Sequence, residues 1–206
     1  MKIKETLTTL VCLLTICVVG VGCSNKESLS DYEKVPLSAS WSYNYESIDE
    51  LTKFSDIIAV ISVDGMNLDK TYESYGVTLT KYSAEIKELI YGEEGSKIDI
   101  IMTGGIDNVE KKIYEVVDDP LMEKGDEYLI FAQKNEDGTY AVLSGSQGRF
   151  VFKNDRVYSL NVINEQVSTN NIYSNIKVDG DKKEDFIMQI SASLDKYEKR
   201  SPSSKY

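Results

Sequence analysis

The chain contains no histidine, one tryptophan, three prolines and three cysteines among its 206 residues. Without histidine it lacks the commonest general base, the commonest metal ligand and every catalytic triad that depends on an imidazole. Few prolines, together with 41% hydrophobic and 28% charged residues, are typical of a folded protein rather than a disordered or collagen-like chain. The length favours a single domain.

Positive charge is also scarce, because 23 lysines and arginines face 34 aspartates and glutamates and leave a net charge of -11. A surface of this sign repels phosphate backbones, so we expect no nucleic-acid partner. Lysine outnumbers arginine 20 to 3, which is typical of AT-rich coding and which we interpret as pointing to a Gram-positive organism.

Long apolar runs are confined to the N-terminus, where residues 1–23 read MKIKETLTTLVCLLTICVVGVGC. Lys2 and Lys4 form a positive start, and Leu7 to Val21 is an apolar segment of secretory length. That segment is shorter than the roughly 20 residues that span a bilayer, and no later segment approaches this length. We therefore predict a signal peptide over residues 1–22 and an exported chain.

The end of this segment, Val21-Gly22-Cys23 followed by the polar SNKES, resembles the lipobox of bacterial lipoproteins. In that family a peptidase cuts just before a cysteine that carries a diacylglycerol. The match departs from the family at Gly20, where leucine is preferred. The resemblance implies that Cys23 is the lipid-attachment residue and that its partner is the lipid bilayer. The alternative is a plain secretory peptide cut near Gly22, which leaves Cys23 as a free thiol.

The cysteine positions agree with lipidation. Cys12 and Cys17 lie in the segment to be removed, so no disulfide can form within the mature chain. Two acyl chains anchor a protein stably, since each buried methylene contributes about 0.8 kcal/mol. We predict a domain held at the extracytoplasmic face of the cell membrane by a polar, lipidated tether over residues 23–44.

Two helices are predicted near the ends of a single β-barrel domain that covers residues 45–199. Ser47 and Glu50 form a capping box ahead of a short helix that ends near Ser55. Asp181 and Glu184 cap a terminal helix with apolar residues at spacings of 4, 4 and 3. Those residues are Phe186, Ile190, Leu194 and Tyr197. Residues 200–206 are predicted to be a frayed tail.

About seven strands are predicted between these helices. Ile57 to Val63 is β-branched almost throughout and indicates a buried strand, followed by a polar loop at 64–76. Val77 to Tyr91 alternates and predicts one bent strand with Tyr82, Ala84 and Ile86 on one face. The acidic segment 106–119 is expected to be a loop or a poorly paired edge. The remaining strands are expected at 98–102, 127–132, 139–143, 149–152 and 156–160.

Antiparallel meanders of this kind fit a small barrel or sandwich. The order SDIIAVISV, a long strand ending LIYG, IDIIMTGG and PLMEKGDEYLIFA resembles the netrin/TIMP-like version of the OB-fold, and also a broad class of uncharacterised envelope lipoproteins. The resemblance covers residues 56–160. It implies a small OB-like antiparallel barrel. Together with the two predicted helices, the expected fold is mainly β, with a short N-terminal helix and a C-terminal helix. In the inhibitor members of this family a free N-terminal cysteine binds a metal, and disulfides are present. Neither feature has a counterpart here, so the resemblance does not imply inhibitory activity.

Two serines, Ser193 and Ser146, lie in motifs that resemble those of catalytic nucleophiles. Ser193 and Lys196 match S-x-x-K, but the S-D-N and K-T-G motifs that complete such a site are absent. Ser146 lies in a glycine-rich bend that resembles a nucleophile elbow, yet one glycine is displaced and no histidine exists to activate the serine. We predict no catalytic residue and no enzymatic activity.

Metal and cofactor sites are not predicted. Zinc would find neither histidine nor a free cysteine. The segment Asp179-Gly180-Asp181 starts like a calcium loop, but Lys183 and Glu184 occupy a ligand position and the loop-glycine position. Carboxylates also cluster between residues 107 and 119, as a solvated loop or a weak Ca²⁺ site. They are Asp107, Glu110, Glu115, Asp118 and Asp119.

Aromatic residues are the most suggestive candidates for a partner surface. Trp41, Tyr43 and Tyr45 alternate just before the first helix, and Tyr72 and Tyr75 lie in the expected polar loop. Such rings suit contact with an envelope protein or a glycan. Alternatively, Trp41 and Tyr43 attach the tether to the barrel. OB-type barrels bind ligands along one face, which supports a surface role by analogy.

We therefore expect a membrane-anchored extracytoplasmic lipoprotein that acts as a binding or interaction module of unknown ligand. One alternative is an immunity or protease-inhibitor-like envelope lipoprotein. The other is an envelope hydrolase that uses two carboxylates about 5 to 10 Å apart. A buried carboxylate pair in a cleft favours the hydrolase, whereas an exposed aromatic patch without such a pair favours binding.

Overall fold

The computed structural model describes residues 31–74, 77–160 and 176–198, with the backbone alone for 65–74 and 198. Two compact units divide the chain at residue 31, and all the elements below belong to the second unit. Several predictions lie outside the described residues. These are the signal peptide, Cys23 and the first part of the tether, Tyr75 and the side chain of Tyr72, and the tail at 200–206.

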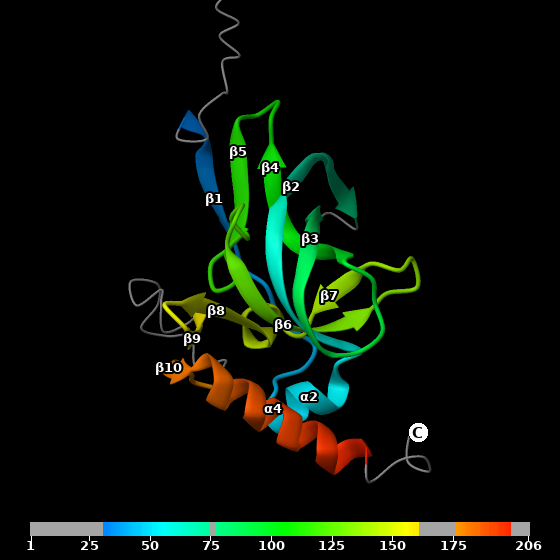
Figure 1. The fold of residues 1–206 in the computed structure, drawn as a ribbon. Helices are drawn as coiled ribbons and strands as arrows, with labels where there is room; N and C mark the ends of the chain where they lie inside the picture. The colour runs from blue at the N-terminus through cyan, green and yellow to red at the C-terminus, as the bar shows by residue number, and fades with distance from the viewer. Residues whose placement is uncertain (1–30, 75–76, 161–175, 199–206) are drawn as a thin grey trace, which may run out of the picture. The chain divides into compact units, whose positions relative to one another are not determined.

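Ten strands, two α-helices and one 3-10 turn form the described fold (Figure 1). The strands are β1 (Glu33–Leu37), β2 (Ile57–Ser74), β3 (Val77–Tyr91), β4 (Lys97–Asp107), β5 (Lys112–Val116), β6 (Glu127–Lys134), β7 (Tyr140–Val142), β8 (Arg149–Lys153), β9 (Arg156–Ser159) and β10 (Asp179–Lys182). The others are helix α2 (Ile48–Phe54), the 3-10 turn η2 (Gly145–Gly148) and helix α4 (Lys183–Glu198).

Five of these strands close a barrel. Antiparallel pairing joins β2 to β3, β3 to β4, β6 to β7 and β6 to β2. The circuit is completed by β4 and β7, which pair in parallel. This order is that of an OB-like barrel, so the predicted fold class, a mainly β domain with a short N-terminal helix and a C-terminal helix, is confirmed.

The barrel interior is apolar and follows the alternation of the strands. Tyr82 and Ala84 are fully buried and Ile86 packs partly buried beside them, on the one face of β3 that the sequence predicts. Ile57 and Ile61 of β2 point into the same core. Burying a large aliphatic side chain contributes about 1.5–3 kcal/mol, so this interior is a main source of stability.

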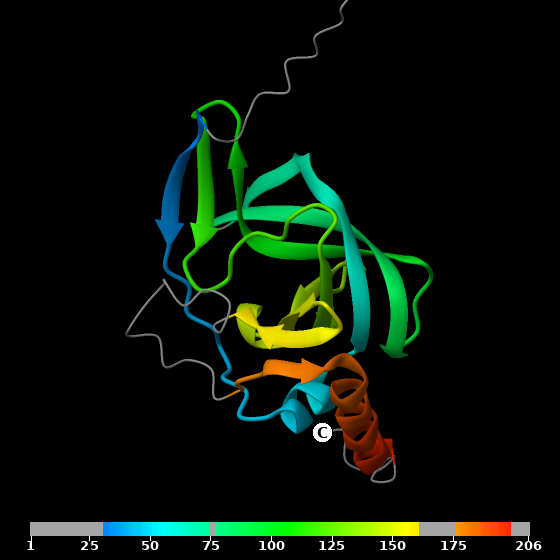
Figure 2. The same ribbon diagram turned by 60° about the vertical axis from the view of Figure 1, so that its left-hand side comes forward.

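A second apolar cluster lies between the barrel and the two helices, which we call the helix side. There Leu51 of α2 and Ile190 of α4 are fully buried, and the rings of Phe131, Phe150 and Phe186 meet at centroid distances of 5.8 and 5.2 Å. Both views show α2 beside α4, below the β8–β9 hairpin (Figures 1 and 2). In the part of the chain that the structure describes, neither helix is long and apolar enough to cross a bilayer.

The helix ends follow the sequence signals closely but not completely. Ser47 Oγ accepts the backbone N–H of Glu50 at 3.2 Å, as in the predicted capping box. The carboxylate of Glu50 reaches the N–H of Glu46 at 2.8 Å, one residue before the expected Ser47. Asp181 does not cap α4, because it belongs to β10, which pairs with β9 and leads directly into the helix.

Three strand segments differ from the sequence analysis. The expected loop at 64–76 is largely strand, since β2 continues to Ser74 along β3 with register shifts. The acidic segment contains β5, which lies between β4 and β1. Residues Glu33–Leu37, expected in the tether, form β1 in parallel with β5. Each of these segments pairs with a strand that the local sequence pattern does not reveal.

Candidate functional site

The chain crosses one end of the barrel between β1 and α2, and we call residues 38–42 of this crossing the strap. Before it, the N–H of Val117 donates to the carbonyl of Leu37 at 3.2 Å. After it, Ser144 Oγ donates to the carbonyl of Tyr43 at 2.6 Å. Within the described residues, no hydrogen bond joins the strap itself to the rest of the chain. The strap is therefore held by hydrogen bonds at Leu37 before it and at Tyr43 after it.

The second attachment is built around the buried side chain of Gln147 in η2. The N–H of Tyr45 donates to Gln147 Oε1 at 3.0 Å, and Gln147 Nε2 donates to Asn44 Oδ1. Tyr45 itself is buried in the helix-side cluster, with its ring 4.7 Å from that of Tyr43. Tyr43 is 48% exposed. Tyr45 thus fastens the chain to the barrel, whereas Tyr43 presents a ring to solvent.

The indole of Trp41, in the strap, packs against Gly145 of η2. A Cβ atom added to Gly145 would lie 2.3 Å from Trp41 Cζ2 and 2.7 Å from Asp119 Oδ2. Gly145 also has a φ of +56°, a conformation that favours glycine. The position therefore requires glycine, and the indole approaches the η2 backbone as closely as it does because no side chain intervenes.

A buried ion pair lies beneath this contact. Arg149 Nη2 binds Asp119 Oδ1 at 2.7 Å, and the two side chains are 1% and 4% exposed. The guanidinium also donates to the carbonyl of Pro120 and lies 5.3 Å from the centre of the Tyr128 ring. Burial raises the pKa of the Asp119 carboxyl, and the Arg149 charge opposes that rise. Burial likewise raises the pKa of Tyr128, to about 12.

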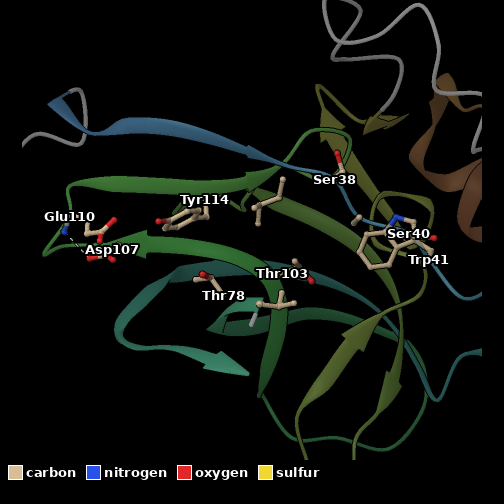
Figure 3. A pocket seen from close by; sticks show the side chains of 11 residues that line it. Ser38, Ser40, Trp41, Thr78, Thr103, Asp107, Glu110 and Tyr114 are labelled. Atoms are coloured by element: carbon tan, nitrogen blue, oxygen red, sulfur yellow. Dashed lines mark hydrogen bonds between the residues drawn. The ribbon is translucent and has the colours of Figure 1, made fainter. Parts of the chain in front are cut away.

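Two hollows flank the strap and share residues 37–41 as a common wall. The larger, the long groove, has a volume of about 800 Å³. Figure 3 shows Asp107 and Glu110 at one end of it, Trp41 at the other, and Thr78 and Thr103 between them. Tyr114 of β5 also lines it. Its volume is in the range of ligand-binding pockets.

The smaller hollow lies on the other side of the strap and has a volume of about 420 Å³. We call it the short hollow. Beyond the shared wall, it is lined by Tyr43, Asn44, Val117, Asp118 and Gln147. Neither cavity is lined by a lysine or an arginine. Both are therefore suited to ligands that are neutral or positively charged.

The aromatic residues predicted as a partner surface do not all meet at one place. Trp41 lines both hollows and Tyr43 lines the short hollow, but Tyr45 is in the core. The backbone of Tyr72 pairs with that of Leu79 in the β2–β3 hairpin. Sequence reasoning missed the hydroxyl-bearing groove residues of β3, β4 and β5. Recognising them required the pairing of β5 with β4 and β1. They are Thr78, Thr103 and Tyr114.

The five carboxylates between residues 107 and 119 are dispersed rather than gathered. Asp107 accepts backbone N–H groups in its turn, and Glu110 pairs with Lys112 at 2.7 Å. Glu115 accepts the N–H of Leu121, while Asp119 faces Arg149. Among the residues that the structure describes, no three histidine, cysteine or acidic side chains are placed to hold a metal ion. These residues give no support to the Ca²⁺ alternative.

The serine of the S-x-x-K motif has a structural partner. Ser193 Oγ is buried and donates to Asp49 Oδ1 of α2, and Lys196 Nζ binds Asp49 Oδ2 at 2.8 Å. The hydrogen bond from Lys196, followed by that from Ser193, lowers the pKa of Asp49. The motif thus joins α4 to α2. Ser146, the other candidate, lies within η2, in a 3-10 turn where a glycine bend was predicted.

No family model matches the chain, and no curated protein is similar to it in sequence. Function is therefore inferred from the strap, the two hollows and their chemistry.

Proposed function

We propose that the protein is a membrane-anchored extracytoplasmic lipoprotein whose barrel is a binding module, with its ligand in the long groove. The observation that carries this proposal is the position of the groove, against the start of β3 and against β4 and β5 of an OB-like barrel. OB barrels bind ligands on the strands that correspond to β3 and β4. Aromatic rings and hydroxyl groups in the lining supply stacking surface and hydrogen bonds.

The chemistry of the groove supports binding better than hydrolysis. A glycosidase-like site needs two accessible carboxyl groups, one of them with a raised pKa. Asp119 has a raised pKa, but it is buried, paired with Arg149 and absent from the lining of both hollows. Asp107, which lines the groove, is occupied by the N–H groups of Val109 and Glu110. A polarised acid–base pair is therefore not present in the groove.

The anchor is tested by the variant Cys23→Ala. We expect the variant to leave the membrane fraction and to take up no labelled palmitate, because no helix of the described residues can hold the chain in a bilayer. Fractionation and metabolic labelling measure this, and circular dichroism checks that the domain still folds. A variant that stays in the membrane pellet, beside a wild type without label, would refute the lipoprotein proposal.

The groove is tested by photo-crosslinking in intact cells. A photoreactive residue at Ser40 lies in the wall of both hollows, while the same residue at Met188 lies on α4, where the side chain is 61% exposed. We expect adducts from position 40 and none of the same mass from position 188. Identical adducts at both positions, or none at position 40, would contradict a ligand in the groove.

A further inference from the structure

Each hollow combines a carboxylate with an aromatic ring. In the long groove these are Asp107 and Tyr114, and in the short hollow they are Asp118 and Tyr43. Trp41 belongs to both. Ammonium and guanidinium groups bind to the faces of aromatic rings and to carboxylates. The same pair of features on both sides of the strap indicates two places for a positive group.

The two carboxylates are not neutralised by a neighbouring cation. Asp107 is held by the backbone N–H groups of Val109 at 2.8 Å and Glu110 at 2.9 Å, which orient the carboxylate without cancelling its charge. Asp118 forms no ion pair with any residue that the structure describes. Arg149, the cation beneath the strap, is already taken up by Asp119. Each hollow therefore retains an uncompensated negative charge.

The strap itself favours a peptide over a small amine. Its backbone N–H and C=O groups make no hydrogen bonds within the described residues, so they can bond to main-chain groups of a segment at the point where it crosses the strap. A small amine would reach one hollow and leave these groups unused. A chain crossing the strap reaches both hollows, and the net charge of -11 attracts a basic segment.

We infer that the ligand of this site is an extended basic peptide segment that crosses the strap and places one lysine or arginine side chain in each hollow. This inference rests on the proposed binding function and adds the class of ligand. Main-chain hydrogen bonds to the strap hold the segment, and the two charges select it.

Fluorescence anisotropy with the purified full-length chain in detergent tests the inference. The probes are labelled octapeptides with two lysines separated by one to four serines, counterparts with one lysine, and a counterpart with glutamine at both positions. We expect binding by at least one two-lysine peptide, and affinity about fivefold weaker for each lysine removed. Equal affinity for one-lysine and two-lysine peptides at every spacing would overturn the two-hollow arrangement.

Isosteric variants locate the charges. We expect Asp107→Asn and Asp118→Asn each to weaken the affinity for the two-lysine peptide about fivefold. The double variant should bind this peptide no better than the wild-type chain binds the glutamine peptide. Asparagine keeps the side-chain oxygen that caps the turn at residue 107, so folding is preserved. Glu136→Gln removes the same charge from an exposed turn and should have no effect. An equal loss in all three single variants would reduce the effect to net charge and overturn the inference.

Two further outcomes separate the inference from the proposed function. Binding of a neutral oligosaccharide, lost in Trp41→Leu, with no binding of any basic peptide would keep the groove as a ligand site and overturn the peptide. Self-association of the chain that is abolished by the Asp107 and Asp118 variants would assign the hollows to a second copy and overturn the peptide as well. No binding by any probe, together with no crosslink at position 40, would overturn both proposals.

Discussion

The helix side and the strap end of the domain are held by opposite kinds of interaction. On the helix side, α2 and α4 press apolar side chains such as Leu51, Phe186 and Ile190 against the barrel. At the strap end, the chain is held by the amide of Gln147, the Asp119–Arg149 pair below it and one contact between an indole and a glycine.

This difference has a functional meaning. Apolar burial is non-directional and favours filling every space, so it does not preserve a hollow. Directional contacts hold a segment at a fixed place without filling its surroundings, but each becomes costly when one partner is lost. At the strap end, polar contacts therefore hold the chain in place without filling the two hollows. The apolar packing of the helix side supplies most of the stability of the domain.

The largest effect is expected from a charge placed in the helix side. Ile58 is fully buried there, and Ile58→Asp should prevent folding, because an unpaired buried carboxylate costs several kcal/mol of the roughly 5–15 kcal/mol that stabilises a domain. Ile58→Val is the matched control and should cost about 0.5–1.5 kcal/mol. Urea unfolding followed by circular dichroism measures both, and a folded aspartate variant of wild-type stability would contradict the assignment of this core.

The next largest effect tests the pair beneath the strap. Arg149→Met leaves Asp119 buried without its partner and should lower the unfolding free energy by about 3–5 kcal/mol. Without the arginine, burial and the nearby carboxylates of Asp118 and Glu115 raise the pKa of the Asp119 carboxyl, so the folded state takes up a proton first as the pH falls. The loss should then be larger at pH 8 than at pH 5.

The double variant Asp119→Leu with Arg149→Met is the control for this prediction. Replacing a buried pair by apolar side chains of similar size removes the unpaired charge, so most of the lost stability should return. A double variant as unstable as Arg149→Met would show that the hydrogen bond to Pro120 and the contact with Tyr128, rather than charge compensation, stabilise this end.

The two regions also differ in how far sequence alone predicts them. The Ser47 cap of α2 and the alternation of β3 are local patterns, and the structure confirms them. The apolar stripe of α4 is local too, and Phe186 and Ile190 are buried as predicted. The OB-like order follows from such strands once they are found.

The strap end is determined by contacts between distant residues. β1 and β5 are only five residues long, and β5 is a strand because it lies between β4 and β1, so the groove residue Tyr114 was not predicted. Asp119 and Arg149 are 30 residues apart and carry no shared signal. Trp41 and Tyr43 were found because alternating aromatics attract attention without any knowledge of the fold.

A smaller effect is expected at the contact that supports the strap. Gly145→Ala places a methyl group against Trp41 and requires an unfavourable φ, so stability should fall by about 1–3 kcal/mol. Trp41 is the single tryptophan of the chain, and its emission should shift to the red as the indole is displaced. Gly138→Ala is the control, because it has a φ of +83° but open space for the Cβ. An emission maximum unchanged in Gly145→Ala would argue against the contact.

The smallest effect is expected at Asp49, which Ser193 and Lys196 of the S-x-x-K motif bind on the helix side. The hydrogen bonds from Lys196 and Ser193 lower the pKa of Asp49 below its ordinary value of 3.8, so the unfolded chain takes up a proton first as the pH falls. The stabilisation is therefore present above about pH 4 and is lost below it. Because the Asp49 side chain is 39% exposed, solvent screening limits the contribution to about 1 kcal/mol or less.

Asp49→Asn should lower the urea midpoint at pH 7, and the difference from the wild-type midpoint should close between pH 4 and pH 2. Asp195→Asn, a control at an exposed position of α4, should leave the midpoint unaltered. A difference that stays constant across this range would mean that Asp49 acts through its shape and hydrogen bonds alone, and that its charge adds nothing to the link between α2 and α4.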